Sequence, residues 1–328
     1  MKRCLIFIFA LCAGFAGAAV SAAEHRLTEI SVGYLLQWPT PALFAQNKKT
    51  FDGALGLAVN WVPFVSGNDM NAALAAGQLQ IAYAQGHVPF LVGVTQGLEL
   101  TMVGIAVGYH DNDNCIVRDD AGITRDNAAE LQGKKVALRI GSVSHYRLLR
   151  VLAHLGVDES LVEIVGTADG TASATALQHG DVVMACASGG ALRAISTLGK
   201  PLMTGAEQAQ IGLKLFDTVT VPNVFLDEHP EIVQAFMDVV EASNKHWKKN
   251  PEPMRAAIAR AAQMDPDSVK RTLDGFTFPT AMDQKTDDWL GALVPAYSKD
   301  LADFFVAYGK LEKALDSYDR FVTTRFLR

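Results

Sequence analysis

The sequence predicts an α/β protein with two lobes, on three observations. The chain has 328 residues, which exceeds the size at which a single hydrophobic core usually divides. From Ile30 onward short apolar runs alternate with helical patterns, and this order is typical of parallel β/α units. No repeat, low-complexity tract or long linker interrupts the alternation. We therefore expect two α/β lobes joined by short crossovers.

The first series of expected elements extends to residue 108. Its strands are the apolar runs ISVGYL (30–35), LAVNWVPF (57–64), LQIAYA (79–84) and LTMVGIAVG (100–108). Helical patterns at 41–51, 70–77 and 89–97 connect these strands. Each strand is followed by a short loop and then a helix, as a parallel sheet requires.

The second series begins near Cys115. Its expected strands are NCIVRDD (114–120), GKKVALRI (133–140), LVEIVG (161–166) and DVVMACA (181–187). After GKKVALRI a helix opens in which Leu148, Val151, Leu152 and Leu155 recur at helical spacing. Arg147 and Arg150 fall on another face of this helix, where we expect a solvated surface and no anion site.

Beyond the apolar run FDTVTVPNVF (216–225) the chain becomes mostly helical. Pro230 suits the first position of a helix over 230–247. Further helices are expected over 251–263, over 266–274 and over most of 283–315.

Residues 1–23 are typical of a secretory signal peptide. Lys2 and Arg3 precede an apolar run, and small residues place Val20/Ala22 or Ser21/Ala23 at a cleavage site. Leu11 precedes Cys12, which argues against lipid anchoring. No other apolar run approaches the roughly 20 residues of a membrane span. We therefore expect an exported, soluble mature chain.

Charge and cysteine content narrow the function classes. The formal net charge is −6 and no cluster of lysines or arginines occurs after the signal peptide, so nucleic acid and anionic membranes are poor partners. Cys115 and Cys186 remain in the mature chain, and both lie in strand-like segments. Export permits a disulfide between them. Two buried thiols in adjacent strands are the alternative, which the sequence leaves open.

Three turns share one construction, in which a strand meets polar or small residues and then a helix. They are Ser66-Gly67, Gln85-Gly86 and Gly141 to Ser144. Unpaired N–H groups and the helix dipole let such turns bind anions, although plain helix capping explains each turn alone. Ligands collect at the carboxyl ends of strands in α/β sheets, so three such turns favour a shared site. The expected ligand-binding residues here are Ser66, Gln85, Gly86, Ser142, Ser144 and His145.

The sequence does not favour an enzyme or a metal site. Ser144 lacks the glycine of a nucleophile elbow, because Tyr146 occupies the second position after it. Ser144 and His145 are adjacent on a helix start, where side chains do not face each other. Histidines are scattered, and Asp111-Asn112-Asp113-Asn114 lacks the downstream residues of a calcium loop. We expect this acidic stretch to form a turn or hinge, and we expect no metal and no cofactor.

Asp217 and Trp38 are further candidates. Asp217 interrupts the apolar run LKLFDTVTVP, where an unpaired acid facing a core would be costly. If it faces a cleft, it can balance a ligand ammonium; otherwise it is a solvated strand end or a local salt bridge. Gln37 and Trp38 follow the first strand, where the indole can form a wall of a ligand site or simply pack the loop.

Several long segments together resemble one family. They are FDGALGLAVNWVPFVSGNDMNAALAAGQLQIAYAQG, LQGKKVALRIGSVSHYRLLRVLAHLGV, GDVVMACASGGALRAISTLGKPLMTG, FLDEHPEIVQAF and SYDRFVTTRF. The chain resembles the periplasmic substrate-binding proteins of ABC importers for taurine and related sulfonates. The resemblance implies a bilobed periplasmic-binding-protein (Venus flytrap) fold, with residues 28–107 plus 220–328 in one lobe and 108–219 in the other. Two hinge strands would join these α/β lobes.

The resemblance also implies a ligand and partners. Donors at the helix starts would hold a sulfonate, Asp217 would match the family's aspartate for the ammonium of taurine, and Asp113 would join the site at the hinge. The closed protein, expected as a monomer in the periplasm, would deliver its ligand to a permease and its ATPase subunits. Near relatives often carry a tryptophan close to position 188, where this chain has Ser188. That change leaves room for a larger or differently substituted sulfonate.

Two alternatives remain beside this reading. One is a receptor for another small ligand, such as a sulfate ester, nitrate or a thiamine-precursor pyrimidine. The other is an enzyme on the same clamshell, against which the export signal and the lack of a Cys/His-rich run both count.

Overall fold

The computed structural model describes residues 27–36 and 38–328 of the chain. The expected signal peptide, residues 1–23, and the candidate residue Gln37 lie outside the described residues. None of the helices in the described ranges combines the length and the apolar character that crossing a membrane demands.

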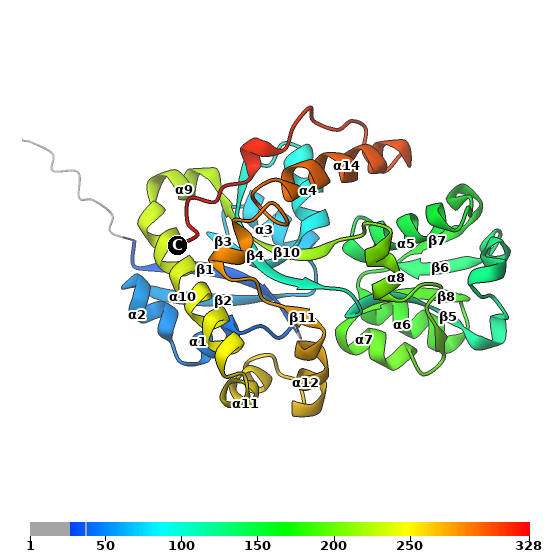
Figure 1. The fold of residues 1–328 in the computed structure, drawn as a ribbon, viewed down its shortest axis with the longest axis horizontal. Helices are drawn as coiled ribbons and strands as arrows, with labels where there is room; N and C mark the ends of the chain where they lie inside the picture. Colours follow the sequence, from blue (N-terminus) through cyan, green and yellow to red (C-terminus); the bar gives the residue numbers. More distant parts are fainter. Residues whose placement is uncertain (1–26, 37) are drawn as a thin grey trace, which may run out of the picture.

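The first lobe is built on a six-stranded sheet with the order β11-β4-β10-β3-β1-β2 (Figure 1). β1 (Glu29–Leu35) lies parallel to both β2 (Ala58–Phe64) and β3 (Ile81–Gly86). β10 (Leu215–Pro222) runs antiparallel between β3 and β4 (Leu100–Tyr109), and the short β11 (Phe276–Thr277) pairs with the outer edge of β4. Every residue of β4 is buried, as expected for an apolar strand covered on both faces.

Helices from two separate parts of the chain complete this lobe. Those of the N-terminal part are α1 (Ala42–Asn47), α2 (Thr50–Leu55), α3 (Gly67–Ala75) and α4 (His87–Thr95). Those of the C-terminal part are α9 (Asn223–Glu228), α10 (Pro230–Lys249), α11 (Glu252–Ala261), α12 (Pro266–Asp274), α13 (Ala281–Gln284) and α14 (Leu293–Ala307), followed by the 3₁₀ turn η4 (Asp319–Phe321). One continuous apolar core joins both sets to the sheet.

The second lobe has a five-stranded sheet with the order β7-β6-β8-β5-β9. These strands are β5 (Asp113–Arg118), β6 (Lys135–Leu138), β7 (Glu163–Gly166), β8 (Met184–Ser188) and β9 (Gly199–Lys200). Its helices are α5 (Val143–His154), α6 (Gly170–His179), α7 (Gly189–Ile195) and α8 (Gly205–Gln210), with 3₁₀ turns η1 (Asp119–Ala121), η2 (Arg125–Leu131) and η3 (Glu159–Leu161). Separate apolar clusters lie on the two faces of this sheet, one packed by α5 and the other by α6 and α7.

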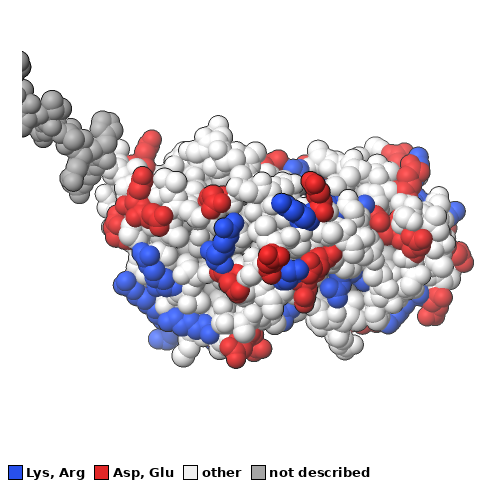
Figure 2. All heavy atoms as spheres, turned by 90° about the horizontal axis from the view of Figure 1, so that it is seen from above, with Lys and Arg blue, Asp and Glu red and all other residues white. Residues whose placement is uncertain are grey.

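The chain crosses between the lobes twice. β4 and β10 lie side by side and antiparallel, and the end of β4 and the start of β10 both lie toward the second lobe in Figure 1, so both crossings occur at the same end of the first sheet. The side chain of Asp111 accepts a hydrogen bond from the N–H of Gly205, and Asn112 donates to the carbonyl of Thr272. The crossing after β4 is therefore tied to both lobes. Both signs of charge occur on each lobe on the face seen in Figure 2.

The structure divides two of the expected helices. The pattern over 41–51 forms α1 and α2, separated at Lys49, whose φ of 53° is left-handed. The segment 283–315 was expected to be mostly helical. It contains the last two residues of α13 and the whole of α14, and residues 285–292 between these helices are not helical. β9 and β11 are two residues long and were not expected, because pairing with distant strands defines them. Pro230 opens α10 as predicted.

The prediction of a solvated face for Arg147 was wrong. Its side chain is 1% exposed, Nε lies 3.3 Å from Oδ1 of Asp113, and Nη2 donates to the carbonyl of His110. Both partners belong to the crossing after β4, which packs against α5 in the folded chain. The helical pattern of α5 alone does not reveal that this crossing packs against it.

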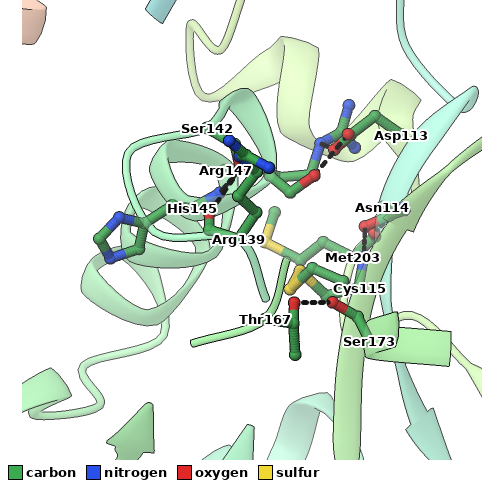
Figure 3. The surroundings of a disulfide bond; sticks show 12 residues. Asp113, Asn114, Cys115, Arg139, Ser142, His145, Arg147, Thr167, Ser173 and Met203 are labelled. Carbon is green, nitrogen blue, oxygen red and sulfur yellow. Dashed lines mark hydrogen bonds and ion pairs between the residues drawn. A yellow bond between two sulfur atoms is a disulfide. The ribbon is translucent and has the colours of Figure 1, made fainter. Parts of the chain in front are cut away.

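The two mature cysteines form a disulfide (Figure 3). Cys115 and Cys186 lie directly opposite each other on the antiparallel strands β5 and β8. The sequence left open either a disulfide or two buried thiols in adjacent strands. The structure has the disulfide. It lies beside the crossing, two residues after Asp113.

Candidate ligand-binding site

A cavity of about 650 Å³, open solvent included, lies between the lobes and is lined by residues of both. Most of the side chains predicted from the sequence meet there: Trp38, Ser66, Gly86, Asp113, Ser142, Ser144, Ser188 and Asp217. The carboxyl ends of strands β1, β3, β6 and β8 lead directly to it, which is where α/β sheets bind ligands.

Five helices begin at this cavity. The residues at their N-caps all line it: Ser66 for α3, Gly86 for α4, Ser142 for α5, Asp169 for α6 and Ser188 for α7. The first N–H groups of a helix lack intrahelical acceptors, and the dipole adds positive potential at the same end. Convergence of these helix starts therefore makes the cavity favourable for an anion without any free lysine or arginine.

Glycine at the start of α3 allows a close approach. A Cβ added to Gly67 would lie 2.8 Å from Cγ of Pro89, so a larger residue would separate the starts of α3 and α4. The side chain of Gln85 reinforces the contact, since Nε2 donates to the carbonyl of Gly67 and to Oδ1 of Asn71. Gln85 is fully buried and does not line the cavity, where only Gly86 of this predicted pair is found.

The hydroxyl protons of three predicted serines are directed at protein acceptors. Ser66 donates to Oδ2 of Asp69, Ser142 to the carbonyl of Arg139, and Ser144 to Oδ2 of Asp113. Ser66 and Ser142 also accept bonds from the N–H groups three residues later, as capping serines do. In this geometry the hydrogen-bond donors that remain available to an anion are backbone N–H groups at the helix starts. Ser188 differs, since its side chain makes no capping bond.

Asp217 lies at the cavity with two neutral donors. Its Oδ2 accepts a 2.7 Å bond from the indole N–H of Trp38, and its Oδ1 accepts a 3.0 Å bond from the hydroxyl of Tyr109. The residue is 1% exposed, and burial raises the pKa of its carboxyl to about 8, against the opposing effect of the two hydrogen bonds. Asp217 is thus neither a solvated strand end nor a local salt bridge.

Asp113, the second acid of the cavity, has a cationic partner. Arg147 lies against its Oδ1, while Ser144 donates to its Oδ2 over 2.6 Å. Burial raises the pKa of Asp113, and Arg147 and Ser144 work in the opposite direction. Because Arg147 balances Asp113 and the third acid, Asp169, caps α6 by accepting a bond from the N–H of Ala172, the acid left for a ligand cation is Asp217.

His145 lies behind the cavity wall. Its Nδ1 accepts a bond from the N–H of Gly141, whose φ of 73° is a conformation that favours glycine. The ring is 6.2 Å from that of Phe305 and points away from Asp113 in Figure 3. Burial lowers the pKa of His145 to about 4, so its imidazole is neutral at pH 7. Its contact is with the loop before α5.

Three of the cavity residues that the sequence analysis did not predict carry polar or charged side chains: Tyr109, Arg139 and Asp169. Tyr109 ends an apolar strand and Arg139 lies inside a predicted strand, so neither stands out locally. Asp169 had a usable signal, because Asp before Gly-Thr-Ala is a typical N-cap followed by a helical run. Throughout the described ranges, no group of three or more His, Cys, Asp or Glu side chains is placed to hold a metal ion.

Comparisons with known proteins agree with this architecture. The model of the family described as NMT1/THI5 like matches residues 39–254. The taurine-binding periplasmic protein of Escherichia coli (strain K12) is 29% identical over 320 residues, which cover 95% of this chain and 97% of that protein.

Solved structures match the fold at low sequence identity. The alkanesulfonate-binding protein of Xanthomonas axonopodis pv. citri, solved bound to MOPS, matches with a TM-score of 0.73 at 20% identity, covering 90% of this chain and 98% of that chain. The periplasmic nitrate-binding protein of Synechocystis PCC 6803 matches with a TM-score of 0.71 at 13% identity, covering 92% and 87%. The predicted bilobed periplasmic-binding-protein fold is therefore confirmed.

Proposed function

The chain belongs to the NMT1/THI5-like family, and from this premise we propose that it is the periplasmic solute-binding component of an ABC importer. The proposed ligand is taurine or a related short aliphatic sulfonate, bound between the lobes. The likeness to a taurine-binding periplasmic protein over 95% of the chain supports this assignment, as does the expected signal peptide. The partners would be a membrane permease and its ATPase subunits.

The observation that carries the ligand class is the pairing of opposite electrostatic features in one cavity. Five helix starts favour an anion, and Asp217, whose two partners are neutral, favours a cation. A sulfonate is ionised at ordinary pH and offers three acceptor oxygens to the backbone N–H groups. An aminoalkanesulfonate carries both charges within a few bonds, so it satisfies both features at once.

Binding and release would use the two lobes. We propose the division predicted from the sequence, with residues 28–107 and 220–328 in one lobe and 108–219 in the other. Donors from both lobes line the cavity, so closure would bring both sets onto the ligand and exclude water. The closed form of a monomer would then be the form that the permease recognises.

A purely anionic ligand is the second candidate. With its pKa raised to about 8, Asp217 is mostly protonated at neutral pH in the ligand-free cavity and does not repel an anion. An alkanesulfonate, a sulfate ester or nitrate would then bind to the helix starts alone. An enzymatic role has less support, since the relatives reported above are named as binding proteins.

Calorimetric titration of the mature protein tests the proposal. Taurine and ethanesulfonate form a matched pair, because they differ only in the ammonium; ethyl sulfate and nitrate complete the series. We expect taurine to bind more tightly than ethanesulfonate, and Asp217→Asn to weaken taurine much more than ethanesulfonate. Absence of binding by every sulfonate would refute the proposed function, while equal losses for both ligands would remove the ammonium role of Asp217.

A further inference from the structure

Two aromatic side chains hold the buried acid of the cavity. Trp38 and Tyr109 both line the cavity, and their planes cross at 87° with ring centroids 5.2 Å apart. Phe276 supports the indole from outside the cavity lining, 4.6 Å away between centroids. The carboxylate of Asp217 is fixed between them, because Trp38 and Tyr109 each donate to one of its oxygens. An acid and two crossed aromatic rings therefore share one end of the cavity.

This arrangement offers few acceptors to a primary ammonium. Such a group has three N–H donors, and each donor left unpaired in a buried site costs free energy. Each oxygen of Asp217 already accepts one bond and keeps one further lone pair, so this carboxylate can pair with at most two of the three N–H groups, and Asp113 is occupied by Ser144 and Arg147. The remaining side chains that the first lobe contributes include the apolar Leu35, Val65 and Pro89. These walls suit carbon substituents better than N–H groups.

An alkylated ammonium fits the same surroundings. Its charge is attracted by the carboxylate and by the electron-rich rings of Trp38 and Tyr109 beside it, without needing a hydrogen bond for each proton. Its methyl groups bury apolar surface against the aliphatic walls. We propose that the cationic end of the ligand is an N-alkylated ammonium, so that the preferred substrates are N-methylated aminoalkanesulfonates. This proposal rests on the proposed function and specifies its ligand further.

The second lobe leaves room for such substituents. A second hollow of about 630 Å³, open solvent included, adjoins the first and shares Trp38, Val65, Asp169, Gly170 and Ser188 with it. Its wall continues through Gly189, Gly190 and Ala191, whose side chains are absent or a single methyl. The indole and these small residues therefore line the same hollow. A bulky residue at position 188 would fill this space.

A methylation series tests the proposal directly. The mature protein is titrated with ethanesulfonate, taurine, N-methyltaurine, N,N-dimethyltaurine and the N,N,N-trimethyl derivative at one pH. We expect affinity to rise along the last four, with the trimethyl compound about tenfold tighter than taurine, a ratio within the range of desolvated cation–π contacts. Taurine binding as tightly as the methylated compounds, or more tightly, would overturn the proposal while leaving the sulfonate function intact. Failure of all five ligands would instead refute the proposed function.

Variants of Tyr109 separate the ring from its hydroxyl. Tyr109→Phe keeps the ring and removes the bond to Asp217, whereas Tyr109→Leu removes both. We expect the trimethyl-to-taurine affinity ratio to persist in Tyr109→Phe and to fall toward one in Tyr109→Leu. The affinity of each variant for ethanesulfonate is the reference, because a general disturbance of the cavity lowers all the affinities together and leaves the trimethyl-to-taurine ratio unchanged. An unchanged ratio in Tyr109→Leu would show that the ring does not recognise the cation, and would contradict the proposal.

Discussion

Arg139 of the second lobe is ion-paired with Asp69 of the first lobe across the mouth of the ligand cavity. Arg139 follows β6 and Asp69 lies in the first turn of α3, with Nη2 3.0 Å from Oδ1. Next to this pair, the side chain of Asn68 donates to the carbonyl of Ile140 over 3.4 Å. Arg139 also donates to the carbonyl of Ala168, before α6. The first two contacts join the lobes, whereas the bond to Ala168 lies within the second lobe.

Removing the ion pair should favour the open protein. The side chains of Arg139 and Asp69 are 21% and 44% exposed, so solvent screens the pair and its contribution should be about 0.2–1 kcal/mol. We expect Arg139→Met to increase the ligand dissociation rate by up to about fivefold. The ligand-free variant should also show a larger radius of gyration in small-angle scattering.

A matched control lies within one lobe. Arg125 pairs with Glu207 at 2.8 Å, and both residues belong to the second lobe. Arg125→Met should leave dissociation and scattering unchanged. If Arg139→Met behaves like this control, the ion pair does not stabilise closure.

Binding of a cationic ligand should strengthen as the pH rises toward 8. Burial raises the pKa of Asp217 to about 8 in the ligand-free cavity, with Asp113 adding in the same direction. Below that pH the ligand must displace a proton, so its affinity falls by up to about tenfold per unit. The N,N,N-trimethyl derivative of taurine is the best probe, because its charge does not titrate.

Two measurements check this linkage. Calorimetry at pH 7 in buffers of different ionisation enthalpy should detect proton release with the trimethyl probe and no release with ethanesulfonate. Asp217→Asn should make binding of the trimethyl probe weaker and independent of pH between 6 and 9. A wild-type affinity that does not change over this range would mean that Asp217 is already ionised without ligand.

Local sequence signals account for most of the site that could be predicted. Ser66, Gly86 and Ser142 were predicted because capping residues after a strand have a recognisable composition, and the structure brings all three to one cavity. Asp217 was conspicuous because a charge inside an apolar strand requires an explanation. These features depend on a few neighbouring residues, so they can be read from the chain.

The residues that were missed or misjudged depend on contacts between distant segments. Tyr109 donates to Asp217 because β10 brings that residue beside β4. Arg147 is paired with Asp113 because the crossing after β4 places Asp113 against α5. Periodicity assigns a residue to a face of its own helix or strand, but it does not reveal what packs on that face. The division of the expected helix 41–51 at Lys49 is similar in kind, since α1 packs against both α10 and α11 while α2 packs against α10.

The buried pair of Asp113 and Arg147 should be costly to break and less costly to replace as a unit. Both side chains are at most 6% exposed, and burial lowers the pKa of Arg147. Arg147→Met leaves a buried acid without its cation, for a loss of about 3–5 kcal/mol in the free energy of unfolding. The double variant Asp113→Asn with Arg147→Met should lose substantially less, as measured by urea denaturation. A double variant that loses as much as the two single variants combined would show that the charges are not coupled.

The disulfide should stabilise the second lobe through the chain that it closes. Cys115 and Cys186 are separated by 71 residues, and a loop of that length corresponds to about 4 kcal/mol in the free energy of unfolding by the chain-entropy estimate. We expect the double variant Cys115→Ala with Cys186→Ala to lose roughly this amount. Unfolding of the wild-type protein with and without a thiol reductant gives the same comparison without any change in sequence. Since Cys186 lines the ligand cavity, bound ligand should also slow reduction of the native protein. Equal reduction rates with and without saturating ligand would place the ligand away from this strand.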